Sequence, residues 1–90
     1  MSNQINILDI AKGVVLGERQ KAYGSPKKNF EKVAKYWSNY LNVEIRPKDV
    51  AMMMILLKVS REENKHTQDN LIDIAGYSLI SEMLEKGDKN

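Results

Sequence analysis

The sequence predicts an all-α protein, a single compact domain (1–90) built as a bundle of about four helices. Apolar residues recur at helical spacing in separate segments, prolines or capping residues stand at the expected helix starts, and no segment alternates as a strand does. A chain of 90 residues supports one domain with a thin core. We therefore expect a homo-oligomer, with short loops and largely antiparallel neighbouring helices.

Composition excludes several classes of protein. The chain has no cysteine and one histidine, which excludes a disulfide scaffold, a thiolate zinc site and a cysteine nucleophile. Its longest apolar run, residues 50–57, is far shorter than the roughly 20 residues of a membrane span. The first residues lack the basic and apolar regions of a signal peptide. These features predict a soluble, cytoplasmic protein that does not bind membranes.

Charge is distributed unevenly along the chain. Residues 1–61 carry 11 basic and 5 acidic side chains, whereas residues 62–90 carry 3 basic and 7 acidic ones. Most of the lysines are expected on helix faces exposed to solvent. The alternative is that they surround the entrance of a positively charged site for an anionic ligand. The basic excess is too small and too mixed to predict binding of a DNA or RNA duplex.

Each expected helix has local start or stop signals. The first helix is expected over 5–16 and is followed by Gly17, and the second begins at Ser25-Pro26 and ends at Asn42. The third begins at Pro47 and ends near 62–64, and the fourth covers 68–86 with Thr67 as its cap. Gly17 is expected to end the first helix in the left-handed conformation.

Two apolar segments are expected to form the core. The second helix carries a stripe at helical spacing that consists of Phe30, Val33, Ala34, Trp37, Tyr40 and Leu41. Residues 50–57 are apolar all round, which predicts a helix buried on most sides. Its three methionines, Met52–Met54, are assigned to the core, with an adaptable pocket or subunit contact as the alternative.

Two ionisable residues interrupt apolar segments, Lys58 in the third helix and Asp73 in the fourth. Lys58 and Arg61 share one helix face, while Asp69, Asp73 and Tyr77 share another. A short turn joins the two helices. Folding back as a hairpin therefore sets both bases roughly level with both aspartates.

Two interpretations of this arrangement compete. In one, the charged side chains form an ion-pair network that only holds the hairpin together. In the other, they line a pocket in which Lys58 and Arg61 hold phosphate oxygens. Asp69 and Asp73 would then contact ribose hydroxyls, a base edge or a divalent cation, and Tyr77 would form part of the wall.

Four segments, which together cover roughly residues 17–80, resemble a family of short, largely uncharacterised proteins of phages and prophages. The shared features are the loop residues Arg19, Tyr23 and Gly24, then Asn29-Phe30, Trp37, Pro47-x-Asp49-Val50, Lys58 with Arg61, and Asp69-Asn70-x-x-Asp73-x-x-Gly76-Tyr77. One departure is Arg46, where a serine or threonine cap would be expected. The resemblance implies that the protein acts in the cytoplasm of an infected bacterial host.

This family is distantly similar to the all-α nucleotide pyrophosphohydrolases of the MazG kind. Those enzymes chelate Mg²⁺ with paired acids, E-x-x-E on one helix and E-x-x-D on the next. The second motif maps loosely onto Asp69 and Asp73. The first has no counterpart, because Met54, Lys58 and Arg61 stand where carboxylates are needed. The resemblance therefore suggests a protein that binds a nucleotide-like ligand without cleaving it.

We accordingly expect a phage-type protein that sequesters a phosphorylated, nucleotide-derived ligand, by analogy a signalling nucleotide of host immunity. The expected ligand-binding residues are Arg19, Tyr23, Gly24, Lys58, Arg61, Asp69, Asp73 and Tyr77, with no catalytic residue, metal or cofactor. One alternative is a Mg²⁺-dependent pyrophosphohydrolase that uses Asp69, Asp73 and Glu62 or Glu63. Another is an inhibitor that binds a host protein through the Met52–Met54 helix and takes no small molecule.

Overall fold

The structure is a computed structural model that describes residues 6–18, 21 and 24–86. Its elements are helical: α1 (Ile7–Gly13), the π-helical turn η1 (Val14–Glu18), α3 (Pro26–Leu41), α4 (Pro47–Asn64) and α5 (Gln68–Lys86). Because no strand occurs in the described residues, the all-α prediction is confirmed. No helix of this part of the chain is both long and apolar enough to cross a bilayer.

The predicted capping residues set most of the helix ends. Ser25 Oγ accepts a hydrogen bond from the Lys28 amide at 3.3 Å at the start of α3, and Thr67 Oγ1 accepts one from the Asn70 amide at 3.1 Å at the start of α5. Asn42 ends α3 in the left-handed conformation, with φ of 59°. These bonds satisfy backbone groups that a helix leaves unpaired at its ends.

The start of α4 uses a carboxylate in place of a cap hydroxyl. Asp49 Oδ2 accepts a hydrogen bond from the Arg46 amide at 2.9 Å and lies 3.4 Å from the Arg46 guanidinium. The backbone N–H of Arg46, and then its side chain, lower the pKa of Asp49. The Asp49 side chain thereby stabilises the first turn although Arg46 offers no cap oxygen.

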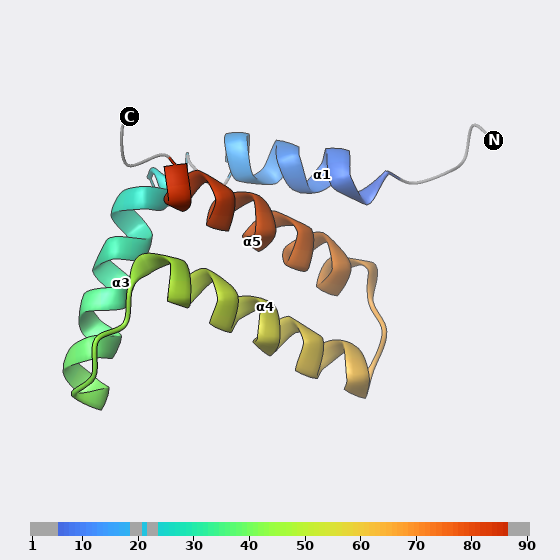
Figure 1. Ribbon diagram of the computed structural model, residues 1–90. Helices are drawn as coiled ribbons and strands as arrows, with labels where there is room; N and C mark the ends of the chain where they lie inside the picture. Colours follow the sequence, from blue (N-terminus) through green and yellow to red (C-terminus); the bar gives the residue numbers. More distant parts are fainter. Residues whose placement is uncertain (1–5, 19–20, 22–23, 87–90) are drawn as a thin grey trace.

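Helix α5 is the central element (Figure 1). Helix α4 folds back against one side of it as an antiparallel hairpin, and α1 lies along the other side. Helix α3 stands across the end of the hairpin where α4 begins. Antiparallel packing therefore holds for α4 and α5, whereas α1 runs in the same direction as α5 and α3 crosses the hairpin.

The core lies where these helices meet. Its main cluster of buried apolar residues consists of Val15, Phe30, Ala34, Val50, Ala51 and Ile80. Gly76 lets η1 approach α5, because a Cβ at Gly76 would lie 3.3 Å from Val15 Cγ2. The wider π turn thus carries Val15 onto α5 at a position where α5 presents no side chain.

The prediction for Gly17 is wrong. Gly17 lies inside η1, and among the described glycines only Gly24 has positive φ. The helical path therefore continues through Gly17 as a π turn, because this turn brings Val15 into the core.

The core predictions for α3 and α4 are also wrong in part. Phe30 and Ala34 are buried, but Tyr40 is 89% exposed and Leu41 is also exposed, since α3 extends past the hairpin. On α4, Val50 and Ala51 are buried while Met52, Met53, Leu56, Leu57 and Val59 are exposed. One side of α4 packs against α5 and α3, whereas these five apolar residues remain exposed in the described part of the chain.

Candidate functional site

The turn between α4 and α5 borders an open hollow of about 540 Å³. Its lining is Lys58, Ser60, Arg61, Asn64, Lys65, Thr67, Asp69, Asn70 and Asp73. The hairpin therefore brings together four of the predicted site residues, Lys58, Arg61, Asp69 and Asp73, around one cavity.

Lys58 and Asp73 form an ion pair across the hairpin. Lys58 Nζ lies 2.8 Å from Asp73 Oδ2. The Lys58 side chain is 17% exposed and that of Asp73 is 39% exposed. The predicted register of the hairpin is confirmed, and Lys58 has the partner that a largely buried ammonium group requires.

Arg61 and Lys65 differ from Lys58 in their surroundings. Both are exposed, both line the hollow, and neither forms an ion pair with any residue of the described part. Asp69 is likewise exposed, and no ion pair between it and Arg61 forms in these residues. Of the ion pairs expected across the hairpin, the described residues therefore form one, and Arg61 and Lys65 line the hollow without an ion-pair partner among these residues.

A second polar network closes the turn beneath the hollow. Asn70 is buried and donates from Nδ2 to Glu62 Oε1 at 3.0 Å and to the Lys65 carbonyl at 3.2 Å. The other carboxylate oxygen of Glu62 contacts His66 Nδ1. The hydrogen bond from Asn70, followed by that from His66, lowers the pKa of Glu62. These contacts rigidify the turn that positions Arg61 and Lys65.

The sequence does not predict this clamp, by which we mean the contacts of Asn70 and His66 with Glu62 and of Asn70 with the Lys65 carbonyl. From the sequence, Asn70 belongs to the family pattern and Glu62 to the alternative metal site, and no role is predicted for His66. The sequence does contain one signal for it: Asn70 stands in the first turn of an apolar helix, eight residues after Glu62. A side-chain amide that becomes buried at such a position needs hydrogen-bond acceptors, and Glu62 can supply one.

In the part of the chain that the structure describes, the acidic residues do not gather into a metal-binding cluster. Among the described residues, no group of three or more His, Asp or Glu side chains is placed to hold one metal ion. Glu62 is engaged with Asn70 and His66.

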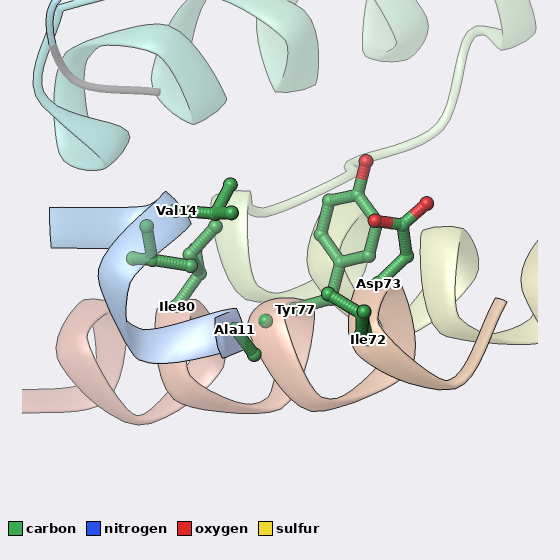
Figure 2. A pocket seen from close by; sticks show the side chains of 8 residues that line it. Ala11, Val14, Ile72, Asp73, Tyr77 and Ile80 are labelled. Atoms are coloured by element: carbon green, nitrogen blue, oxygen red, sulfur yellow. The ribbon is translucent and has the colours of Figure 1, made fainter. Parts of the chain in front are cut away.

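Tyr77 lies beside the hollow, in a smaller pocket that shares Asp73 with it. Figure 2 shows the Tyr77 and Asp73 side chains next to each other on α5, with Ala11 and Val14 at the far side of this pocket. The Tyr77 ring also packs at a tilt against Phe30, with centroids 6.3 Å apart. Tyr77 is therefore partly a core residue.

The remaining predicted residues precede α3 in the sequence. Gly24 is exposed, has φ of 82° and does not line the hollow. The predictions for Arg19 and Tyr23 lie outside the described residues.

Comparison with known proteins identifies the family. Residues 6–85 match the family model described as a domain of unknown function, DUF6378. The chain belongs to the DUF6378 family. This finding confirms the resemblance to short uncharacterised phage proteins, and the match covers the described helices up to the penultimate residue of α5.

The relatives come from mycobacteriophages. The Gene 55 protein of Mycobacterium phage L5 is 43% identical over 83 residues, which are 90% of this chain and 53% of that protein. The Gene 55 protein of Mycobacterium phage D29 is 42% identical over 74 residues, or 81% of this chain and 49% of that protein. The DUF6378 chain thus spans about half the length of these relatives. No solved structure matches it.

Proposed function

We propose that the hollow at the α4–α5 turn binds a phosphorylated, nucleotide-derived ligand and releases it unchanged. The observation that supports this proposal is that three cations, Lys58, Arg61 and Lys65, line a cavity that holds two carboxylates, and that Arg61 and Lys65 form no ion pair within the described part of the chain. The planar guanidinium group of arginine can donate two parallel hydrogen bonds to one phosphate, and arginine is therefore common at phosphate-binding sites. The cavity of about 540 Å³ also falls within the range of small-molecule sites.

The Lys58–Asp73 pair would take part in binding by exchanging partners. A phosphate oxygen that approaches Lys58 Nζ competes with Asp73 Oδ2, which lies 2.8 Å away. Asp73 and the exposed Asp69 could then accept hydrogen bonds from ribose hydroxyls. Tyr77 borders the same carboxylate and offers an aromatic edge to a base or sugar.

The phage relatives give this binding activity a biological setting. A small phage protein that holds a nucleotide without cleaving it suits the sequestration of a host signalling nucleotide, including one that serves bacterial immunity. In this proposal the chain needs no metal or cofactor and binds no nucleic-acid duplex. We expect it to act as a homo-oligomer in the bacterial cytoplasm.

The test is incubation of the purified chain, with and without Mg²⁺, with a panel of nucleoside triphosphates and linear, cyclic and ADP-ribose-type nucleotides. Free ligand is quantified by HPLC before and after heat denaturation of the protein. We expect one class of nucleotide to leave the free pool and to return intact on heating.

Two results contradict the proposal. Conversion of a triphosphate to its monophosphate in the presence of Mg²⁺ would show a pyrophosphohydrolase. A free pool that stays unchanged for every nucleotide would leave the charged hairpin with a structural role and direct attention to protein partners.

A further inference from the structure

We propose that the apolar corner between α3 and α4 is a self-association surface that joins two copies of this chain. We define the α3–α4 corner as Tyr36, Trp37, Tyr40, Leu41 and Met53 together with three further exposed residues of α4, Met52, Leu56 and Leu57. This surface lies apart from the hollow at the α4–α5 turn, and no residue lines both.

The outer side of α4 has the wrong composition for a surface in water. Residues 50–60 contain one charged side chain, Lys58, and it is turned toward Asp73 on α5. Away from α5, Leu56 is 65% exposed, with Met53 and Leu57 also exposed. Met52 is exposed at the edge next to α5, where its Sδ lies 3.7 Å from Ser81 Oγ. A helix on the surface of a monomer normally presents charged or polar residues there.

Helix α3 forms the second side of this apolar surface. Its C-terminal half stands across the start of α4 (Figure 1), and the angle between the two helices holds an open, mainly apolar hollow of about 610 Å³. Tyr36 and Tyr40 form one wall, and Met53 of α4 forms the other. The corner therefore combines a hollow with exposed apolar side chains of α4, of which Leu56 is the most exposed.

The size of the surface matches that of one side of a stable dimer. A large side chain presents about 200 Å² when fully exposed, and the exposed fractions of the corner residues then correspond to on the order of 800 Å². Monomeric proteins seldom expose apolar patches larger than about 600 Å².

A second copy is the occupant that these features favour. A surface that carries both a hollow and exposed apolar side chains can meet the same surface of a second copy across a two-fold axis, as a two-fold dimer requires. The single chain is only 21 Å thick along its shortest axis, which corresponds to about two layers of helices. Dimerisation through the α3–α4 corner would bury apolar residues that such a thin molecule cannot cover by itself.

The experiment is sedimentation equilibrium of the purified chain and three variants over a range of micromolar concentrations. Leu56→Glu and Tyr40→Glu place a charge on each wall of the surface at exposed positions, so both variants should fold. Leu8→Glu is the matched control, because Leu8 is 67% exposed on α1 and lies outside the α3–α4 corner. Circular dichroism verifies the helix content of each variant.

We expect the wild-type chain and Leu8→Glu to approach twice the 10.3 kDa of one chain. Leu56→Glu and Tyr40→Glu should weaken dimerisation about tenfold or more while remaining helical. A monomeric wild type overturns the proposal, including the case in which the corner binds another protein instead. Equal effects of Leu56→Glu and Leu8→Glu overturn it as well. Neither outcome bears on nucleotide binding, which the HPLC experiment tests separately.

Discussion

Asn70 joins α4 to α5 through two hydrogen bonds, to Glu62 Oε1 and to the Lys65 carbonyl. Replacing Asn70 with alanine removes both donors and leaves the two acceptors without their partner in a partly buried turn. We expect Asn70→Ala to lower the free energy of unfolding by about 1–3 kcal/mol. Urea denaturation checks this, with Asn39→Ala, an exposed asparagine of α3, as the control expected to change little. Equal stabilities of the two variants would contradict a stabilising role of the Asn70 hydrogen bonds.

Glu62 makes the stability of the same turn depend on pH. Hydrogen bonds from Asn70 and His66 lower its pKa in the folded state. A carboxylate with a lowered pKa contributes stability above its ordinary pKa, and this contribution is lost as the pH falls through the folded value. We expect the urea midpoint of the wild type to fall between about pH 5 and pH 3, and to fall less steeply in Glu62→Gln. Glu63→Gln, at the exposed neighbouring position, should retain the wild-type slope.

At this scale the sequence predicts partners better than it predicts burial. Lys58 and Asp73 could be paired in advance because an ionisable group within an apolar segment needs a counter-charge. Asn70 could not be placed in the same way, because an amide near a helix start is equally suited to solvent. Its burial depends on the path of the turn, which brings Glu62 back within hydrogen-bond reach.

Among the elements, α4 depends on one carboxylate for its start. Asp49 accepts the Arg46 amide at 2.9 Å, whereas Arg46 supplies no cap oxygen. We expect Asp49→Ala to reduce the free energy of unfolding by about 1 kcal/mol. Chemical denaturation measures the change, and Glu44→Ala in the preceding loop is the control. If Asp49→Ala matches the wild type, the first turn of α4 is held by packing alone.

The contact between η1 and α5 depends on the absence of a side chain at Gly76. A Cβ there would lie 3.3 Å from Val15 Cγ2, so a small side chain requires a slight shift and a large one requires α1 and η1 to move away. We expect Gly76→Leu to destabilise the fold by about 1–3 kcal/mol and Gly76→Ala to have a much smaller effect. Thermal unfolding compares them, and a Gly76→Leu variant as stable as Gly76→Ala would contradict close packing of η1.

Element boundaries could largely be predicted from Ser25, Asn42, Pro47 and Thr67, because caps act over a few residues. The side of each helix that faces the core could not. The apolar run over residues 50–57 is equally compatible with a helix buried within one chain and with a helix shared between two. The crossing of α3 decides which residues are covered, and this crossing results from long-range packing.

At the scale of the whole molecule, the fold separates two surfaces on α4. The side toward α5 carries Lys58 and Arg61 at the polar hollow, and the outer side carries the apolar α3–α4 corner. The sequence predicted the first surface from charged residues on a hairpin. The predicted roles of Arg19 and Tyr23 lie outside the described residues and stay predictions.

Arg61 separates a binding role of the hollow from a structural one. Lys58→Ala would disturb both, because Lys58 is paired with Asp73. Arg61 is exposed and forms no ion pair within the described part of the chain, so its removal should leave folding intact. Lys35, an exposed lysine of α3 outside the hollow, provides a control for the loss of one positive charge.

The most direct measurement is therefore the affinity of wild type, Arg61→Ala and Lys35→Ala for the nucleotide class retained in the HPLC panel, determined by isothermal titration calorimetry. We predict that Arg61→Ala weakens binding by about tenfold to a hundredfold, as loss of a charge-assisted phosphate contact requires, with an unchanged melting temperature. Lys35→Ala should bind as the wild type does. Equal affinities of all three proteins, or a loss of binding in Arg61→Ala that accompanies unfolding, would contradict the assignment of the α4–α5 hollow as the ligand site.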